Sequence, residues 1–451
     1  MCGFLYSTYN LTDEEVEKTE FTVKNRGPDA KNVLSDSKGT FVHYLLHITG
    51  EKTTQPIRSS NDDVRLLYNG EVYNYSELGN YKSDGPAILD AYVSEGINGI
   101  RKLDGEFSGV IRDETSNKLV LFRDTFGTKP MFFGSTSRGL FVCSYQSQAI
   151  ELGANQIFMP EPNTILEICL KSMAIVKHSY REFDLEQKKN TYDDWYEAFF
   201  NSIRKRTNNN RVKYFIGLSS GYDSGLISAV MTEIGVDFKS YSIQAAEDID
   251  VIKQRAQILK HNEYFHLTEM EFEKQKTFLQ KNCEPFTTPP RHNRPNGYSV
   301  LRDKGAVGTG IICEKARNDD CKVYMSGQGS DEILSDYGHN GQLAPGFLHG
   351  TIAGKFPEDL STVFPWENFY QGTQLEFIAK DENVGGTYGI ETRYPFLDPA
   401  LVQEFLWMNH HLKNAKYKAP IDYALRKMNF PMSKQGLFGK VGFRANSNYR
   451  K

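Results

Sequence analysis

Short runs of β-branched and aromatic residues, divided by turn sequences, recur through the first 180 residues of the chain. Such runs predict strands, here at residues 4–6, 40–48, 64–68, 107–112, 119–122, 131–133, 140–143 and 165–169. Helical spacing interrupts them twice, at residues 12–20 behind a threonine cap and at residues 84–94. This pattern predicts stacked antiparallel sheets with flanking helices.

The pattern changes beyond a polar stretch at residues 181–190, which we interpret as a linker. Strands predicted at residues 212–218, 238–243 and 323–325 alternate with helices predicted at residues 195–206, 225–234 and 250–260. This alternation is typical of a parallel, doubly wound sheet. The last hundred residues are mostly helical, most clearly at 401–408 and 421–428. Residues 336–366 have the glycine, proline and polar content of a mobile loop or lid.

Length and charge narrow the classes of function. A chain of 451 residues is long enough for two or three domains. Its 53 basic and 57 acidic side chains give a net charge of −4, which argues against binding nucleic acid through a large basic face. No apolar run approaches the roughly 18 residues of a membrane span, and the N-terminus lacks the pattern of a secretion signal. We therefore expect a cytoplasmic protein without a membrane partner.

Six cysteines are scattered along the chain without a CxxC pair, which favours reduced thiols over a metal site. Cys2 differs from the other five because of its position. Removal of Met1 would give it a free α-amine with a pKa of about 8, and that amine can serve as the base for its own thiol. By itself, a cysteine at this position more often has no such role.

Two further segments of the N-terminal half allow two interpretations each. Asn69 and Gly70 follow an apolar strand, where a side-chain amide and a glycine N–H can stabilise an oxyanion. The dipeptide Asn-Gly is, however, more commonly a hairpin turn. Arg26 precedes Gly27-Pro28, which is either a simple turn or a loop that fixes one guanidinium.

The C-terminal half contains two motifs, at residues 219–224 and 326–332, that each follow a predicted strand and precede a helix. Small and hydroxyl residues there expose backbone N–H groups at a helix N-terminus, which binds phosphate. Asp223 can hold Mg²⁺ against that phosphate; the alternative is an ordinary turn with a serine cap. Residues 308–310 and 350–356 lack the spacing of a dinucleotide fingerprint or a Walker loop, and we assign neither to nucleotide binding.

In combination these motifs resemble the glutamine-dependent asparagine synthetase family, in the same order and over nearly the whole chain. The N-terminal landmarks are those of a class II glutamine amidotransferase: Met1-Cys2-Gly3, residues 26–29, Gln55-Pro56, residues 69–74, Ser83-Asp84 and Arg123-Asp124. Residues 218–224 are similar to the family's pyrophosphate loop, LSGGxDS, residues 326–332 to its SGEGSDE segment, and residues 389–398 to its GxExRxPFLD segment.

The resemblance implies a fold for each half. Residues 2–180 would form a glutaminase domain, an α+β N-terminal nucleophile (Ntn) hydrolase sandwich with αββα layers. After the linker at 181–190, residues 191–451 would form an α/β, doubly wound PP-loop ATP-pyrophosphatase domain that makes an amide. The implied partners are glutamine, ATP with Mg²⁺, and a small carboxylate; a homodimer is the assembly we consider.

The resemblance also implies the role of each matching residue. Cys2 would attack the glutamine carboxamide, Asn69 and Gly70 would stabilise the oxyanion, and three residues would bind glutamine: Arg26, Glu71 and Asp84. Ammonia would pass through an internal channel to a second site, where ATP converts a carboxylate to an acyl-adenylate. The ATP pyrophosphate would lie on Leu218, Ser219, Ser220, Gly221, Tyr222, Asp223, Ser224, Ser326, Gly327 and Gln328.

Two further assignments follow from the resemblance. Mg²⁺ would bind at Asp223 and Asp331. Lys434 would neutralise charge in the adenylation and acyl-transfer transition states. Lys440 is the rival for that role, and a solvated surface lysine is the alternative for either.

Three positions depart from the family pattern. Leu45 replaces the arginine that binds the glutamine carboxylate, so His47 or another group must take that place, or the glutaminase is weak and ammonia is used directly. Ser220 replaces a glycine, which is tolerable if its φ is negative. Gln328 replaces a glutamate that helps to take a proton from the incoming nitrogen. Glu332 or another group then substitutes, or the acceptor differs from aspartate.

The sequence favours a glutamine-hydrolysing, ATP-dependent amidotransferase whose acceptor is aspartate or a specialised metabolite. One alternative is an adenylating synthetase that uses an intramolecular amine, as the β-lactam synthetases do, with an impaired glutaminase domain. Intact Cys2, Asn69 and Asp84 argue against it. The other is a non-catalytic binding protein, against which the intact Asp223 and Asp331 argue.

Overall fold

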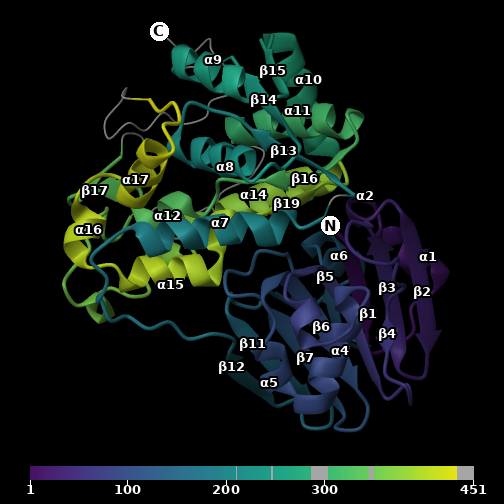
Figure 1. The fold of residues 1–451 in the computed structure, drawn as a ribbon. Helices are drawn as coiled ribbons and strands as arrows, with labels where there is room; N and C mark the ends of the chain where they lie inside the picture. Colours follow the sequence, from purple (N-terminus) through teal and green to yellow (C-terminus); the bar gives the residue numbers. More distant parts are fainter. Residues whose placement is uncertain (210, 245–246, 286–302, 345–349, 434–451) are drawn as a thin grey trace. The chain divides into compact units, whose positions relative to one another are not determined.

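The computed structural model describes residues 1–209, 211–244, 247–285, 303–344 and 350–433. They divide into two compact units (Figure 1). The first unit consists of Met1–Glu182 together with Asn282–Glu284 and Gly386–Ile390, and the second contains the other residues. Among the described helices, none is both long and apolar enough to cross a membrane.

The first unit contains two six-stranded antiparallel sheets. One sheet has the order β10-β8-β9-β1-β3-β2, with strands at Gln156–Phe158, Phe132–Thr136, Gly139–Cys143, Gly3–Ser7, Gly39–Leu45 and Ala30–Asp36. The other has the order β12-β11-β7-β6-β5-β4, with strands at Ile175–Ser179, Thr164–Cys169, Lys118–Arg123, Gly105–Asp113, Val64–Val72 and Ile57–Arg58. Six helices accompany them: α1 (Asp13–Thr19), α2 (Val23–Arg26), α3 (Tyr75–Leu78), α4 (Asp84–Glu95), α5 (Ile97–Arg101) and α6 (Gln146–Glu151).

Side-chain alternation along the strands produces the four layers of this unit, because successive residues of a strand face opposite sides of a sheet. Phe4 in β1 faces Leu67 in β5, in a core between the two sheets. Leu5, the next residue, packs with helix residues on the outer face of the first sheet. Leu66 likewise packs against Ile88 of α4 on the outer face of the second sheet. The predicted αββα sandwich is confirmed.

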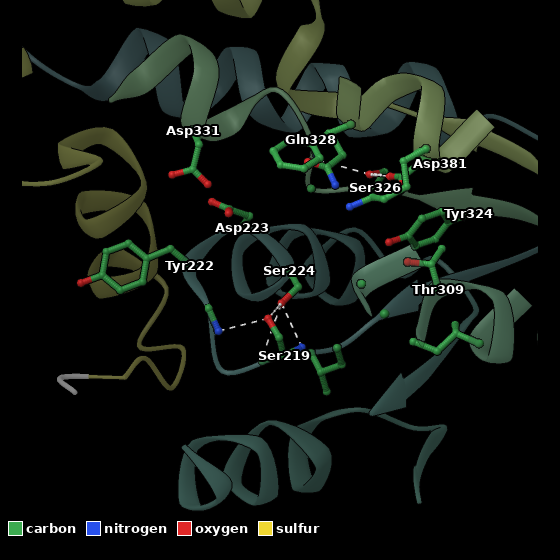
Figure 2. A pocket seen from close by; sticks show the side chains of 18 of the residues that line it. Ser219, Tyr222, Asp223, Ser224, Thr309, Tyr324, Ser326, Gln328, Asp331 and Asp381 are labelled. Carbon is green, nitrogen blue, oxygen red and sulfur yellow. Dashed lines mark hydrogen bonds between the residues drawn. The ribbon is translucent and has the colours of Figure 1, made fainter. Parts of the chain in front are cut away.

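The second unit is built on a five-stranded parallel sheet with the order β15-β14-β13-β16-β19. Its strands are Asn262–Phe265, Phe238–Ile243, Lys213–Gly217, Cys321–Met325 and Glu391–Arg393. The chain moves from β13 to β14 and β15 on one side, then returns to β16 and β19 on the other. The loops after β13 and β16 therefore meet at the topological switch point, where α/β sheets bind ligands (Figure 2). The predicted doubly wound parallel sheet is confirmed.

Helices surround this sheet in the second unit. They are α7 (Asp193–Thr207), α8 (Tyr222–Glu233), α9 (Ile249–Ile258), α10 (Glu269–Asn282), α11 (Lys304–Asn318), α12 (Ser330–Leu334), α13 (Glu367–Tyr370), α14 (Thr373–Thr387), α15 (Pro399–Trp407), α16 (His410–Asn414) and α17 (Ala419–Lys427). The sequence pattern did not predict α11, and it predicted the region of α14 only as part of a mostly helical last hundred residues. Glycines at 305, 308 and 310 and at 385–386 disguise their helical spacing, and both helices line the pocket described below.

One expectation was wrong, and another stays a prediction. Asn69 and Gly70 do not form a turn but lie inside β5, where Gly70 has a φ of +126° and a Cβ atom would approach the Glu106 carbonyl oxygen to 2.0 Å. The described residues among 336–366 are mostly irregular, as predicted for a loop, and their mobility stays a prediction. They contain the short strands β17 (Gly338–His339) and β18 (Gln342–Leu343), and the side chains of Phe356 and Trp366 are buried.

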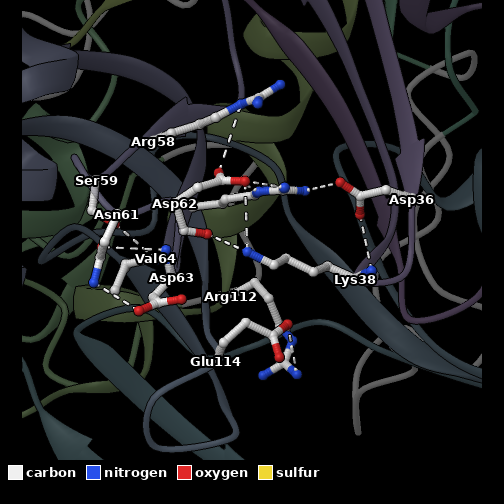
Figure 3. Close-up of polar contacts among 11 residues, drawn as sticks. Asp36, Lys38, Arg58, Ser59, Asn61, Asp62, Asp63, Val64, Arg112 and Glu114 are labelled. Carbon is white, nitrogen blue, oxygen red and sulfur yellow. Dashed lines mark hydrogen bonds and ion pairs between the residues drawn. The ribbon is translucent and has the colours of Figure 1, made fainter.

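An ion-pair cluster links the two sheets of the first unit at their turns (Figure 3). Arg65 of β5, only 3% exposed, contacts Asp36 of β2 at 2.8 Å and Asp62 at 2.6 Å. Lys38 lies 3.6 Å from Asp62. Because Asp36 and Arg65 belong to different sheets, this cluster connects them in addition to the apolar core.

Replacing Arg65 by Met should lower the free energy of unfolding by about 1–3 kcal/mol, because its buried guanidinium makes charged hydrogen bonds. The matched control is Lys82→Met, which removes a 3.1 Å pair with Glu51 whose side chains are 78% and 64% exposed. That change should cost less than about 0.5 kcal/mol. Urea denaturation of both variants measures the difference, and equal effects would show that the Arg65 cluster adds nothing.

Candidate active sites

The first candidate site surrounds Cys2, at the start of β1. The Cys2 carbonyl oxygen accepts a hydrogen bond of 3.0 Å from Nε of Arg26, and the Cys2 thiol lies 3.8 Å from the Leu46 carbonyl oxygen. Arg26 is fully buried and also donates to the hydroxyl of Tyr145 at 2.9 Å. The sequence predicts that Arg26 binds substrate; the structure gives it contacts with the Cys2 backbone.

Asn69 is a buried polar residue whose side chain lacks partners. It is fully buried, and neither its Oδ1 nor its Nδ2 has a hydrogen-bond partner among the described residues. Burying an unpaired amide costs about 1–3 kcal/mol, so such a group indicates that a ligand completes the site. Gly70, the next residue, adopts a backbone conformation that favours glycine. This arrangement fits the predicted role of Asn69 and Gly70 in stabilising an oxyanion.

Three of the predicted glutaminase residues gather around Tyr68. Asp84, the first residue of α4, accepts hydrogen bonds from the Tyr68 hydroxyl at 2.6 Å and from the Val72 N–H at 3.0 Å. Burial, followed by the charges of Asp84, Cys2 and Glu71, raises the pKa of Tyr68 well above its usual value. The structure therefore brings Cys2, Glu71 and Asp84 to one place.

Leu45 and His47 lie at the end of β3 and just beyond it. The Leu45 side chain is nearly buried and apolar, as the sequence implies. The His47 ring lies 3.1 Å from the Gly50 carbonyl oxygen, and its backbone N–H donates to Asp29 at 2.8 Å. These contacts fix His47 within its own loop.

The second candidate site is a pocket of about 370 Å³ at the switch point of the parallel sheet (Figure 2). All ten predicted pyrophosphate residues except Ser220 line it, and so does Asp331. Helices α11 and α14 supply further lining residues that the sequence did not indicate: Gly305, Thr309, Ile312, Phe377, Lys380 and Asp381.

Glu247, which is partly buried, and Arg255, which is fully buried, hold the loop after β13. The Ser220 N–H donates to the Glu247 carboxylate at 2.8 Å, and the Ser220 hydroxyl donates to the same oxygen at 2.5 Å. Arg255 donates to the carbonyl oxygens of Ser219 and Gly221. Ser220 has no positive φ, so its presence instead of glycine is accommodated, and its hydroxyl is used. The loop then leads into α8, whose first N–H groups make no bond within the helix.

Lys418 connects the two predicted metal ligands. Its Nζ lies 2.7 and 2.8 Å from the two carboxylate oxygens of Asp223 and 3.0 Å from Asp331. Asp331 also accepts a 2.5 Å hydrogen bond from the Tyr417 hydroxyl. Burial alone would lower the pKa of Lys418, but the two neighbouring carboxylates outweigh it and raise that pKa. The structure thus gives this pocket a buried cation that sequence reasoning missed, since no motif marks Lys418.

The structure does not test the two lysines that the sequence offers as catalytic residues. Lys434 and its rival Lys440 lie outside the described residues. The role of Lys434 stays a prediction, and Lys418 is the lysine that the structure places against Asp223 and Asp331.

Glu332, the predicted substitute for the glutamate that is absent at position 328, does not line the pocket. It accepts hydrogen bonds from the Tyr337 hydroxyl and, at 3.1 Å, from the Gly329 N–H. Burial and the adjacent charge of Asp331 raise the pKa of Glu332 to about 7. Among the described residues that line the pocket, the carboxylates are instead Asp223, Asp303, Asp331 and Asp381.

Two protein families match the chain. The family described as "Glutamine amidotransferase domain" matches residues 1–182, and the family described as "Asparagine synthase" matches residues 194–351. The first match covers the main segment of the first unit, and the second covers residues 194–351 of the second unit.

The curated relatives match over most of the chain. "Asparagine synthetase [glutamine-hydrolyzing]" of Gallus gallus is 26% identical over 443 residues, covering 87% of this chain and 74% of the relative. "Putative asparagine synthetase [glutamine-hydrolyzing] 1" of Methanocaldococcus jannaschii is 26% identical over 404 residues, covering 81% and 68%. The solved structure of glutamine phosphoribosylpyrophosphate amidotransferase from B. subtilis is 12% identical, with a TM-score of 0.34 over 99% of this chain and 98% of its own, a likeness too weak to support a conclusion.

Replacing Asn69 by Ala should remove glutamine hydrolysis and yet raise the free energy of unfolding by about 1 kcal/mol, because an unpaired buried amide disappears. Ser108, which faces Asn69 across the β5–β6 pair, donates to the Pro130 carbonyl oxygen at 3.2 Å. Its replacement by Ala is the matched control and should destabilise the protein. Thermal unfolding compares the two; a clear loss of stability in Asn69→Ala would mean that the amide is structurally bonded.

Proposed function

We propose that this chain, which belongs to the glutamine-dependent asparagine synthetase family, forms a carboxylic amide from ammonia that it releases from glutamine. Its class of activity, an ATP-dependent carbon–nitrogen ligase with glutamine as nitrogen donor, follows from the two matched families and the relatives. The observation that carries the proposal is that one chain combines the buried, unpartnered Asn69 amide with a switch-point pocket lined by a phosphate-binding loop. The acceptor is a small carboxylic acid, aspartate or a specialised metabolite.

At the first site, the Cys2 thiol attacks the glutamine carboxamide. With Met1 removed, the Cys2 α-amine takes the thiol proton and delivers it to the departing ammonia. The Asn69 amide and the Gly70 N–H stabilise the oxyanion that develops on the carbonyl oxygen. Glu71 and Asp84 bind the glutamine α-ammonium, and Arg26 orients the Cys2 backbone. The intact Cys2 and the unpartnered Asn69 disfavour an impaired glutaminase.

At the second site, the loop after β13 and the N-terminus of α8 receive the pyrophosphate of ATP. The acceptor carboxylate attacks the α-phosphorus, which gives an acyl-adenylate and pyrophosphate. Ammonia then displaces AMP. Ser219 and Ser224, whose hydroxyls lie 2.8 Å apart at the start of α8, offer further donors to the phosphates.

The residues of this pocket fit a magnesium ion. Asp223 and Asp331 already converge on one cation, the Lys418 ammonium, and carboxylate oxygens are the ligands that Mg²⁺ takes in proteins. No group of three or more ligating side chains is found among the described residues, in keeping with an ion bound by two carboxylates and phosphates. When bound, Mg²⁺ would neutralise phosphate charge. Lys418 would then be available to do the same on the α-phosphate side.

Replacing Lys418 by Met should lower the free energy of unfolding by about 2–4 kcal/mol, because two facing carboxylates lose their counter-ion. Millimolar Mg²⁺ should restore the lost stability in the absence of ATP, whereas wild-type protein should not respond. Lys416→Met, which removes a lysine that is 51% exposed, is the control. Thermal unfolding with and without Mg²⁺ measures this; equal Mg²⁺ responses in wild type and Lys418→Met would contradict the assignment.

Replacing Cys2 by Ala should abolish glutamine-dependent amide formation and leave ammonia-dependent formation within about twofold, because only the nitrogen source is removed. Cys169→Ala, which changes a partly exposed cysteine of the same unit, should leave both activities intact. AMP and pyrophosphate release, measured with a panel of L-aspartate, L-glutamate, succinate and malonate, follows the reaction. Release of ADP and phosphate, or equal loss of both activities in Cys2→Ala, would contradict the proposal.

A further inference from the structure

The amide-forming step needs a group that accepts a proton, and the residue at position 328 cannot be that group. Gln328 lines the pocket, but a neutral carboxamide is not a base at physiological pH. Glu332 is engaged by Tyr337 and by the Gly329 N–H. Of the pocket carboxylates, Asp223 and Asp331 pair with Lys418, and Asp303 lies 3.3 Å from Lys380. Asp381 is the remaining carboxylate among the described residues that line the pocket.

Asp381 is attached to the same loop as Gln328. It lies on α14, is 1% exposed and lines the pocket. Its carboxylate accepts a 2.6 Å hydrogen bond from the Ser326 hydroxyl, whose oxygen in turn accepts the Gln328 N–H at 3.2 Å. Figure 2 shows Gln328 between two acidic groups, with Asp223 and Asp331 on one side and Ser326 and Asp381 on the other. Asp381 is thus connected through Ser326 to the loop that carries Gln328.

The surroundings of Asp381 suit a proton acceptor that works near neutral pH. Burial raises its pKa to about 6, against the lowering effects of the Lys380 charge and the Ser326 hydrogen bond. Four other charged or titratable groups interact electrostatically with Asp381. They are Glu382 on α14, Asp303 at the N-cap of α11, Cys313 within α11 and Tyr324 on β16. Lys380 itself stays charged, because Asp303 and Asp381 outweigh the effect of burial on its pKa.

We propose that Asp381 takes up the proton that ammonia loses when it attacks the acyl-adenylate. This inference rests on the proposed function. In the step, a bond forms between the ammonia nitrogen and the acyl carbon, and the bond from that carbon to the AMP oxygen breaks. AMP leaves with the electron pair of the broken bond. One proton passes from nitrogen to the Asp381 carboxylate and then to water, so the step needs no further reactant.

The test separates adenylate formation from amide formation. Ammonium chloride replaces glutamine, and the acid of the panel above that gives the fastest ATP–pyrophosphate exchange in wild type serves as acceptor. Asp381→Asn should keep pyrophosphate exchange within about threefold and lose amide formation by about 10²–10⁴-fold, the usual contribution of a general base. Glu332→Gln, which alters the other buried carboxyl near this segment, should keep both.

Wild-type protein provides a second measurement that does not depend on a variant. With total ammonium adjusted at each pH so that free NH3 stays constant, amide formation should fall as the pH drops through about 6, because a protonated Asp381 cannot accept a proton, while pyrophosphate exchange should not fall in this range. The positive charge of Lys380 favours the ionised Asp381 carboxylate. Its removal in Lys380→Met should therefore move the fall in amide formation to higher pH, and Lys380→Arg should restore the wild-type pH dependence.

The outcomes are distinct. Equal loss of exchange and amide formation in Asp381→Asn, unchanged amide formation, or a fall in amide formation at low pH that persists in that variant would overturn the inference. If wild type releases ADP and phosphate instead of AMP and pyrophosphate, the proposed function itself fails, and the role of Asp381 fails with it.

Discussion

The electrostatic contact of Lys418 with Asp223 and Asp331 is the interaction on which the pocket at the switch point depends. These residues come from the segment before α17, from the first turn of α8 and from α12, which are distant in the sequence. Two carboxylates facing each other without a cation would repel, so the buried ammonium allows the two loops of the switch point to lie close together. A bound metal ion would also neutralise the Asp223 and Asp331 carboxylates. The Lys418 ammonium and the ion are therefore alternative counter-ions for the same two side chains.

Both candidate sites contain polar groups that ordinary folding would avoid. In the first unit, the Asn69 amide is buried with no partner among the residues that the structure describes, and Gly70 adopts a conformation that favours glycine. In the second, Lys380 and Asp381 are almost completely removed from water. The Asn69 amide is costly unless a ligand completes it, whereas Lys380 and Asp381 are held by Asp303 and Ser326. The presence of such buried polar groups at two separate places in one chain is the physical reason for assigning two linked reactions to it.

The fold could be predicted from the sequence wherever a local pattern determines it. Residues 4–6 and 119–122 are short, continuous apolar runs and form strands. The glycines at 305–310 instead conceal α11, because tertiary packing overrides their low helix propensity. The motifs identified Asn69 and Asp223, but not Lys418 or Asp381, whose importance comes from contacts with residues far away in the chain. The direction of Glu332 likewise depends on Tyr337 and cannot be derived from its motif.

The central claim is that one chain transfers nitrogen from glutamine to an acid activated as an adenylate. A single labelling experiment tests it most directly. Glutamine labelled with ¹⁵N in the amide and the acceptor acid labelled with ¹⁸O in its carboxylate are incubated with ATP, and the products are analysed by mass spectrometry. The account predicts ¹⁵N in the new amide and one ¹⁸O atom in AMP. An unlabelled amide, or ¹⁸O in inorganic phosphate instead of AMP, would contradict it.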